Sequence, residues 1–302
     1  MSLRVLDPGL HSLLVDFGRP RTRSLGVPVG GAADRFALAI ANALVGNSPD
    51  CCALEISLAG PTLRAEHDMG CVVFGGRFEI ETEQTRVQCG LTFMLRAGEE
   101  LRIGGAVAGL TGYLCVAGGF QTARILDSQT GLRPIRTGDT LACAASSIPR
   151  RFVLCNFNWN QEPRVIRVTD GPQAGWFTRE SFFSQEFRVL PASNRMGMRL
   201  EGHPLTVPNR ELTSEPVCPG SVQVIRDGQC IIIGVDGQTI GGYPKIVQVI
   251  AADLDKLGQL RPDDRIRFQA VPLAEAERLR RRKKEELNEW LTRLRTAERF
   301  GP

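Results

Sequence analysis

Short apolar runs separated by turn residues fill residues 53–143 of the chain. They recur at intervals of roughly ten residues, at 53–58, 70–74, 77–81, 91–95, 100–103 and 112–117. A second set of apolar runs follows further along, at residues 164–168, 187–190, 199–201, 222–225, 231–235, 246–250 and 265–268. Strands at such regular spacing are typical of a β-barrel or a β-sandwich. The pattern therefore predicts a mainly β protein with two strand-rich halves.

Apolar residues at helical spacing interrupt these strands at a few places. Phe36, Ile40 and Leu44 recur at the spacing of one helix face, and Gly46 follows as a stop signal. The last part of the chain is rich in Ala, Glu, Leu, Arg and Lys, which favour helix. The predicted helices are residues 36–44, 176–183, 251–260 and 272–298.

The composition along the chain indicates where domains divide. Residues 144–163 combine Ala, Ser and Pro with a polar, Asn-containing stretch, and they resemble a linker more than any other segment. We therefore expect a first β-domain at residues 1–150, a second at residues 151–271, and a charged C-terminal helix at residues 272–302. The basic run of that helix, residues 280–284, is most simply a solvated face.

Composition argues against several classes of protein. No apolar run reaches the length of a membrane span, and the N-terminus lacks the apolar core of a secretory signal. The nine cysteines form no CxxC pair and do not cluster with the three histidines. We therefore expect reduced core thiols, a cytoplasmic protein and no metal site. The formal net charge is only +4, and much of it lies in the C-terminal segment, so we expect no nucleic-acid partner and no membrane partner.

One loop between two apolar runs concentrates unusual residue types. It reads Gly237-Gln238-Thr239-Ile240-Gly241-Gly242-Tyr243-Pro244-Lys245. The glycine pair lets the backbone approach another group closely, and Gln238, Tyr243 and Lys245 supply an amide, a phenol and a cation. A tight turn with an exposed lysine is the alternative interpretation, and the pattern alone leaves both open.

Three other segments carry candidate binding residues. Asp34 ends a Gly-rich stretch before the first predicted helix, where it can bind a ligand or simply cap the helix. Arg195 can clamp a carboxylate or phosphate, or belong to a structural ion-pair network. Ser214 beside Glu215 can bind an amide substrate, or form a turn.

Taken together, the motifs of this chain resemble those of one family, the carboxyltransferase-domain proteins. This family includes urea amidolyase, allophanate hydrolase subunit 2 and the C subunit of bacterial 5-oxoprolinase, also called KipA. The resemblance covers about residues 4–270 in unbroken order. The matching segments are residues 16–19, 26–34, 41–47, 53–56, 60–63, 116–119, 194–202, 238–245 and 260–262.

This resemblance implies a fold of two cyclophilin-like β-barrel units and a role within a larger assembly. Its implied partners are the B subunit, or KipI, and the A subunit of 5-oxoprolinase, which together use ATP to open the 5-oxoproline lactam to glutamate. It assigns Lys245, Tyr243 and Gln238 as catalytic donors to a small amide substrate. The further substrate-binding residues expected are Asp34, Arg195, Thr239, Gly241, Gly242, Ser214, Glu215 and Asn42.

Two other functions remain open at this point. The chain can be a biotin-dependent carboxyltransferase acting on urea or a similar amide, with biotin on a separate carrier. It can also be a regulatory binding protein without catalysis, as the name KipA implies. The chain departs from the family at Val15 and Gly237, where members often have Gln and Arg, and losing that Arg removes a strong anion contact.

Overall fold

The computed structural model describes residues 2–154 and 164–296. Within it the chain divides into two compact units. Unit 1 comprises residues 1–20, 34–159 and 286–302, and unit 2 comprises residues 21–33 and 160–285. Residues 155–163 of the predicted linker, and 297 and 298 of the predicted C-terminal helix, lie outside the described residues.

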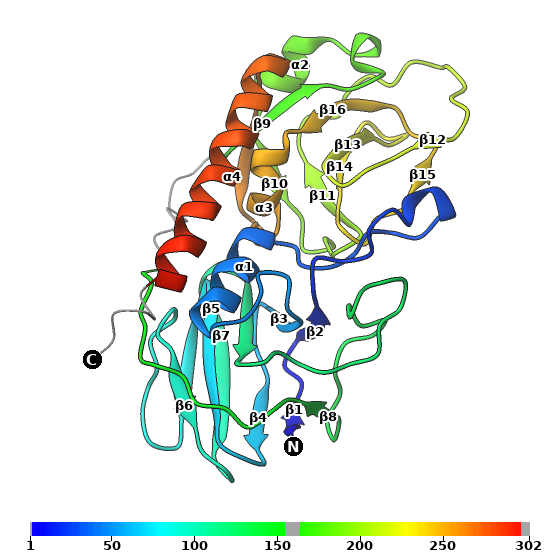
Figure 1. The fold of residues 1–302 in the computed structure, drawn as a ribbon. Helices are drawn as coiled ribbons and strands as arrows, with labels where there is room; N and C mark the ends of the chain where they lie inside the picture. Colours follow the sequence, from blue (N-terminus) through cyan, green and yellow to red (C-terminus); the bar gives the residue numbers. More distant parts are fainter. Residues whose placement is uncertain (1, 155–163, 297–302) are drawn as a thin grey trace. The chain divides into compact units, whose positions relative to one another are not determined.

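An open eight-stranded antiparallel sheet forms unit 1 (Figure 1). Six strands follow the order β2-β3-β7-β4-β1-β8, while β5 pairs with both β7 and β6. Because this pairing does not close into a ring, the unit is a half-barrel. Its strands are β1 (Ser2–Asp7), β2 (His11–Val15), β3 (Ala53–Ser57), β4 (Thr62–Ala65), β5 (Met69–Thr82), β6 (Phe93–Leu95), β7 (Glu100–Val116) and β8 (Thr140–Ala142).

The two longest strands, β5 and β7, each merge two apolar runs that the pattern treats as separate strands. Gly75 lies inside β5 with φ 119°, and the register of β5 against β7 shifts there. Opposite it, Gly112 of β7 lies so close to Phe78 that a Cβ on Gly112 would be 2.7 Å from the ring. The expected breaks at residues 75–76 and 104–111 are therefore wrong: Gly75 marks a bulge and Gly112 a close ring contact inside continuous strands.

Helix α1 (Arg35–Leu44) covers β5 and β7 within unit 1 (Figure 1). Its start is fixed by Asp34, whose side chain accepts a hydrogen bond from the Ala37 backbone at 2.9 Å. Its end is a Schellman motif, in which Gly46 adopts φ 81° and Asn47 N donates to the Asn42 carbonyl. The predicted helix at residues 36–44 is confirmed, since capping residues and apolar spacing agree.

Unit 2 is built on a closed seven-stranded barrel with the order β10-β11-β14-β13-β16-β9-β17. Strands β9 and β17 pair in parallel, and the other neighbours are antiparallel. Phe182, Phe187 and Phe268 pack together in its core, with Phe182 stacked on Phe268 and Phe187 edge-on to Phe268. The strands are β9 (Arg164–Asp170), β10 (Phe187–Val189), β11 (Gly197–Glu201), β13 (Ser221–Val224), β14 (Cys230–Ile233), β16 (Lys245–Val249) and β17 (Arg265–Ala270).

The helices of unit 2 are shorter than their sequence patterns predict. The apolar stretch at 176–183 forms the 3-10 turn η2 (Ala174–Trp176) and the helix α2 (Arg179–Phe183). The stretch at 251–260 forms the 3-10 turn η3 (Ala251–Asp253) and α3 (Leu254–Leu257). The short turn η1 (Arg23–Leu25) precedes the Gly-rich segment.

A small two-stranded ribbon accompanies the barrel of unit 2. It pairs β12 (Glu215–Pro216) with β15 (Ile240–Gly241), so that Glu215 lies opposite Gly241. The loop at residues 237–245 therefore contains a short strand of its own. Glu215 and Gly241 lie on this ribbon, and most of the other predicted site residues lie in the segments that flank it.

The long helix α4 (Leu273–Thr296) follows the last barrel strand (Figure 1). Ala276 is buried with Ile250 and Ala252, so this part of α4 packs on unit 2. Together these elements confirm the predicted fold class, mainly β with a few helices and a C-terminal helix.

Candidate functional site

The strongest polar cluster of unit 2 is centred on Lys245, the first residue of β16. Val222 and Val224 of β13 face the barrel core, so Gln223 between them faces outward. Lys245 is the register partner of Gln223 and therefore lies on the same outer face. Both side chains are nevertheless buried, with Lys245 4% and Gln223 2% exposed. A lysine buried at this level requires a partner.

Glu215 of the ribbon supplies that partner. The Lys245 Nζ lies 2.7 Å from the Glu215 Oε2, and the Glu215 side chain is 37% exposed. The bond from Lys245 and a second from Gln173 lower the pKa of Glu215 below its ordinary value. In this ion pair the Lys245 side chain is buried, whereas the Glu215 carboxylate is partly accessible to solvent.

Gln173 ties the pair to the start of η2. Its Oε1 accepts a hydrogen bond from Lys245 N at 3.0 Å, and its backbone N donates to the Lys245 carbonyl at 3.1 Å. Its Nε2 donates to Glu215 Oε2 at 3.1 Å. Hydrogen bonds therefore join Gln173, Glu215 and Lys245, which come from three segments far apart in the sequence.

The glycine pair of the central loop plays two different parts. A Cβ on Gly241 would lie 2.7 Å from the Gln238 Nε2 and 2.8 Å from the Gln223 Nε2. A Cβ on Gly242 would meet nothing closer than 3.6 Å, at the Ser214 Oγ and the Leu212 carbonyl. A Cβ on Gly241 would therefore make two amide side chains shift, whereas one on Gly242 would make only ordinary van der Waals contacts.

The remaining predicted residues of the loop differ in their accessibility. Tyr243 is 39% exposed, and Gln238 and Ser214 are exposed as well. Thr239 is buried, and its carbonyl accepts a hydrogen bond from Val217 N at 2.8 Å. The structure thus brings together Lys245, Glu215, Gln238 and Gly241, with Thr239 supporting the ribbon.

Arg195 is engaged elsewhere in unit 2. Its Nε lies 2.6 Å from Asp236 Oδ2, and its Nη2 donates to the Gly31 carbonyl at 2.7 Å. Gly30 N in turn donates to the Val235 carbonyl at 3.0 Å. The Gly-rich segment is therefore fastened to the loop after β14, and Arg195 acts as its clamp. These contacts give Arg195 a structural role, and its role in substrate binding stays a prediction.

Asp34 and Asn42 belong to unit 1, where both serve α1. The Asp34 side chain caps the helix, and its backbone N donates to the Tyr113 hydroxyl at 2.8 Å. The Asn42 side chain is fully buried and donates to the Cys51 carbonyl at 2.8 Å. Tyr113 itself donates to the Glu55 carboxylate at 2.8 Å, and burial raises the pKa of its phenol well above the ordinary value.

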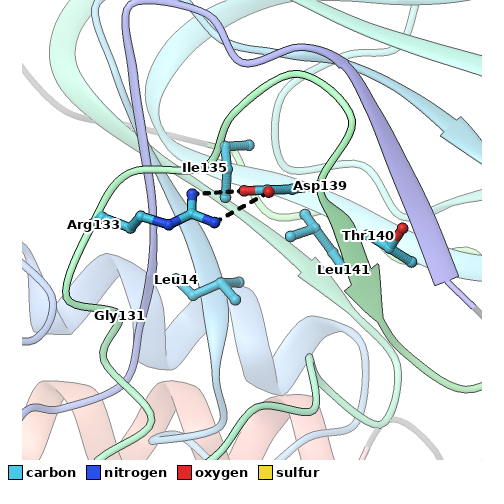
Figure 2. A pocket seen from close by; sticks show the side chains of 7 residues that line it. All are labelled: Leu14, Gly131, Arg133, Ile135, Asp139, Thr140 and Leu141. Atoms are coloured by element: carbon cyan, nitrogen blue, oxygen red, sulfur yellow. Dashed lines mark hydrogen bonds and ion pairs between the residues drawn. The ribbon is translucent and has the colours of Figure 1, made fainter.

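Unit 1 also has a surface hollow, shown in Figure 2. Arg133 crosses it and pairs with Asp139, with Nη1 to Oδ2 at 2.8 Å (Figure 2). Asp139 also accepts from Arg136 N at 2.9 Å, and the bond from Arg133 holds its pKa below the ordinary value. Since these two charges satisfy each other and shape a turn, the hollow offers a weaker site than the Lys245 cluster. Its other lining residues are Leu14, Gly131, Ile135, Thr140 and Leu141.

Two residues of the Lys245 cluster, Gln173 and Gln223, are missing from the sequence prediction. Gln223 sits in a Val-Gln-Val alternation, which indicates an outward face but not that another segment covers it. Gln173 follows the turn at Gly171 and Pro172, where a polar residue is ordinary. Only the alternation at Gln223 carried a signal that sequence reasoning could have used.

Neither a metal-binding cluster nor a membrane-spanning helix occurs within the described residues. Within residues 2–154 and 164–296, no group of three or more His, Cys, Asp or Glu is placed to hold a metal ion. None of the helices in those residues is long and apolar enough to cross a membrane. The Gly-rich segment, with Gly30 N and the Gly31 carbonyl engaged within unit 2, is not arranged as a phosphate cradle.

Comparison with known proteins identifies the class of protein that this fold and site define. The model of the carboxyltransferase domain, subdomain A and B, matches residues 25–270. The chain therefore belongs to the carboxyltransferase-domain family.

Within that family, one relative is similar over nearly its whole length. The chain is 36% identical to the C subunit of 5-oxoprolinase from Haemophilus influenzae, over 92% of this chain and 94% of that protein. Two solved structures resemble it as well. One is TTHA0988, at 33% identity and a TM-score of 0.82, where the match covers 89% of this chain and 56% of that one. The other is the Kluyveromyces lactis urea amidolyase, at 26% identity and a TM-score of 0.87, covering 96% of this chain and 20% of that one.

Proposed function

We propose that this protein is the C subunit of an ATP-dependent 5-oxoprolinase, which opens the 5-oxoproline lactam to glutamate together with a KipI-like B subunit and with the A subunit. The observation that carries this proposal is the extent of the match. The chain corresponds to 94% of a protein named as the C subunit of 5-oxoprolinase, whereas it corresponds to only 17% of the yeast urea amidolyase. This difference in coverage supports the subunit interpretation over the urea amidolyase one.

The Lys245 cluster has the groups that lactam opening requires. In that reaction a water adds to the carbonyl carbon, the C–N bond breaks, and the departing nitrogen takes up a proton, while ATP is consumed. Donors are needed at the carbonyl oxygen, where negative charge develops. Lys245 has three N–H donors, of which Glu215 takes one, and Gln238 and Tyr243 lie on the same loop. Glu215 can in turn accept from the lactam N–H.

Partner subunits supply the nucleotide chemistry in this proposal. ATP is a substrate of the assembled enzyme, and we assign no residue of this chain to its phosphates. None of the eight cysteines among the described residues forms a disulfide, including the neighbours Cys51 and Cys52. Reduced cysteines in this number favour a reducing compartment, and we propose the cytoplasm.

The test is reconstitution of the complete enzyme. The chain purified with the A and B subunits should release glutamate from 5-oxoproline only when ATP is present. Lys245→Met should lower kcat/KM by about 100-fold, the effect of losing one preorganised donor. The matched control is Lys284→Met, which removes an exposed lysine of α4 and should leave turnover unchanged. A full set of subunits that fails to release glutamate would contradict the proposal.

A second candidate function is carboxyl transfer from biotin to urea or a similar amide. The fold match to the Kluyveromyces lactis urea amidolyase, with a TM-score of 0.87 over 96% of this chain, favours it. This reaction needs biotin on a separate carrier. Supplying a biotinylated carrier, bicarbonate, ATP and urea, and measuring carboxylated urea, would distinguish the two functions.

A further inference from the structure

The side-chain amide of Gln223 has one buried donor atom without a partner in the described residues. Its Nε2 is inaccessible to solvent and has no hydrogen-bond partner within residues 2–154 and 164–296. An unsatisfied buried donor costs about 1–3 kcal/mol, so such groups are rare in folded proteins. Gln223 is the register partner of Lys245 and faces the same side of the sheet. The unsatisfied Nε2 donor of Gln223 therefore points to an acceptor that a bound ligand supplies.

A second amide converges on the same place. The Nε2 atoms of Gln223 and Gln238 both lie within 2.8 Å of the position that a Cβ on Gly241 would occupy. An acceptor oxygen placed near this position can receive a hydrogen bond from each amide. Gln238 is exposed, so its flexible side chain can move and admit a ligand to the buried Gln223. The absence of a side chain at Gly241 keeps the two amides close.

The carboxylate of Glu215 adds an acceptor beside these donors. Glu215 is the register partner of Gly241, so its carboxylate belongs to the ribbon position next to the two amides. Lys245 neutralises its charge, and both glutamines are neutral, so the cluster as a whole carries no net charge. Its chemistry matches a neutral amide group that presents a carbonyl oxygen and an N–H side by side, whatever charge the rest of the ligand carries.

We propose that Gln223 and Gln238 bind the carbonyl oxygen of a lactam or primary amide, while Glu215 accepts its N–H. This deepens the proposed function and rests on the same site. In a lactam, and in a primary amide such as urea, an N–H lies on the same side as the carbonyl oxygen. In an ordinary secondary amide the N–H points to the opposite side, as in a trans peptide bond. The cluster therefore selects lactams and primary amides and rejects trans secondary amides.

Binding of three small probes to the full-length chain, measured by ligand-observed NMR, tests this specificity. 2-Pyrrolidinone has the matching oxygen and N–H and should bind. N-methyl-2-pyrrolidinone lacks the N–H, and N-methylacetamide presents it on the wrong side, so both should bind at least about 10-fold more weakly, the effect of one hydrogen bond of ordinary strength. Equal binding of all three probes, or absence of 2-pyrrolidinone binding to the wild-type chain, would overturn the proposal.

Two variants test the residues. Gly241→Ala should weaken 2-pyrrolidinone binding by about 10-fold, because the new methyl group displaces both amides. Gly175→Ala, in the same unit with nothing within 4 Å of the new Cβ, should bind like the wild type. Gln223→Met keeps the volume of the side chain and removes the unsatisfied donor. It should lose binding while its melting temperature rises by about 2–4 °C.

The outcomes separate this proposal from the proposed function. A Gln223→Met chain that melts at a lower temperature and binds 2-pyrrolidinone normally would show that Gln223 is only structural. Normal binding by Gly241→Ala would likewise count against the donor pair, even if the reconstituted enzyme releases glutamate. Conversely, the chain can bind a lactam through Gln223 while the reconstituted enzyme releases no glutamate. That result would refute the proposed reaction but support the lactam-binding site.

Discussion

At the scale of single residues, side chains of the same charge have different partners and different roles in this protein. Lys245 and Arg195 are both cations predicted to bind substrate. Lys245 lies buried against Glu215, whose carboxylate retains an accessible side, whereas Arg195 is held by Asp236 and the Gly31 carbonyl. The sequence indicates charge and loop context, but the partner of each cation depends on which segments meet it. Glu215 was predicted and Gln223 was not, since a glutamine between two valines usually faces water.

Asp253 shows at the same scale how a buried charge links stability to pH. It is fully buried and accepts hydrogen bonds from Arg167 N at 2.9 Å and Arg167 Nε at 3.0 Å. Burial alone would raise the pKa of Asp253, but the bonds from Arg167 outweigh it and the pKa is lowered. The stabilisation is therefore complete above the unfolded pKa of about 3.9 and is lost as the pH falls through the folded pKa.

We predict that Asp253→Asn lowers the free energy of unfolding at pH 7 by about 1–3 kcal/mol, because a charged acceptor of several bonds is lost. The gap to the wild type should narrow as the pH falls below about 4, since only the wild-type carboxylate titrates there. Urea unfolding followed between pH 3 and pH 7 measures both effects. The control Asp170→Asn removes an exposed pair with Arg179 and should change stability by less than about 1 kcal/mol. A constant gap at all pH values would contradict the linkage.

At the scale of elements, the predictions succeed where local signals agree. Apolar spacing, the Asp34 cap and Gly46 together define α1, and residue composition defines α4. The predictions are wrong where a glycine is present because of a contact or a bulge in the folded sheet. The glycines inside β5 and β7 look like breaks along the chain, but in the sheet they form a bulge and admit the Phe78 ring. The helices predicted at residues 176–183 and 251–260 are present but shorter, because apolar spacing does not distinguish a 3-10 turn from a helix.

We predict that Gly75→Ala destabilises unit 1. The residue has φ 119°, and a Cβ would lie 2.7 Å from the Thr111 carbonyl, so the variant should lose about 1–3 kcal/mol of stability. The matched control is Gly105→Ala on β7, where a Cβ meets nothing within 4 Å and φ is not positive. Thermal melting followed by circular dichroism compares the two variants. Equal melting temperatures would show that β5 does not depend on this bulge.

For the whole molecule, α4 is the element whose role the sequence left most open. Its apolar residues are few, and its basic run at residues 280–284 is largely exposed. Lys283 is the exception: its Nζ donates to the Ala252 carbonyl at 2.9 Å and pairs with Asp255. The start of the helix is held by the burial of Ala276 against Ile250 and Ala252. These contacts favour a structural helix over a nucleic-acid-binding one.

Paired substitutions on α4 test this role. Ala276→Asp places a carboxylate among apolar side chains and should lower the unfolding free energy by about 1–3 kcal/mol. Ala274→Asp adds the same charge at an exposed position in the first turn and should be neutral within about 0.5 kcal/mol. Urea denaturation of both proteins gives the comparison. If both variants unfold like the wild type, α4 does not depend on this contact.

The sequence by itself determined the strand-rich halves, helices α1 and α4, and the loop from Gln238 to Lys245 that indicates the family. These features depend on spacing and residue type within short stretches, which a linear pattern preserves. Only the tertiary structure decided that Gln173, Gln223 and Glu215 meet at Lys245, and that the Gly-rich segment joins unit 2 through Arg195. The physical reason is that burial and partnership arise from strand pairing between distant segments, which covers outward-facing side chains that a strand alone would leave in water.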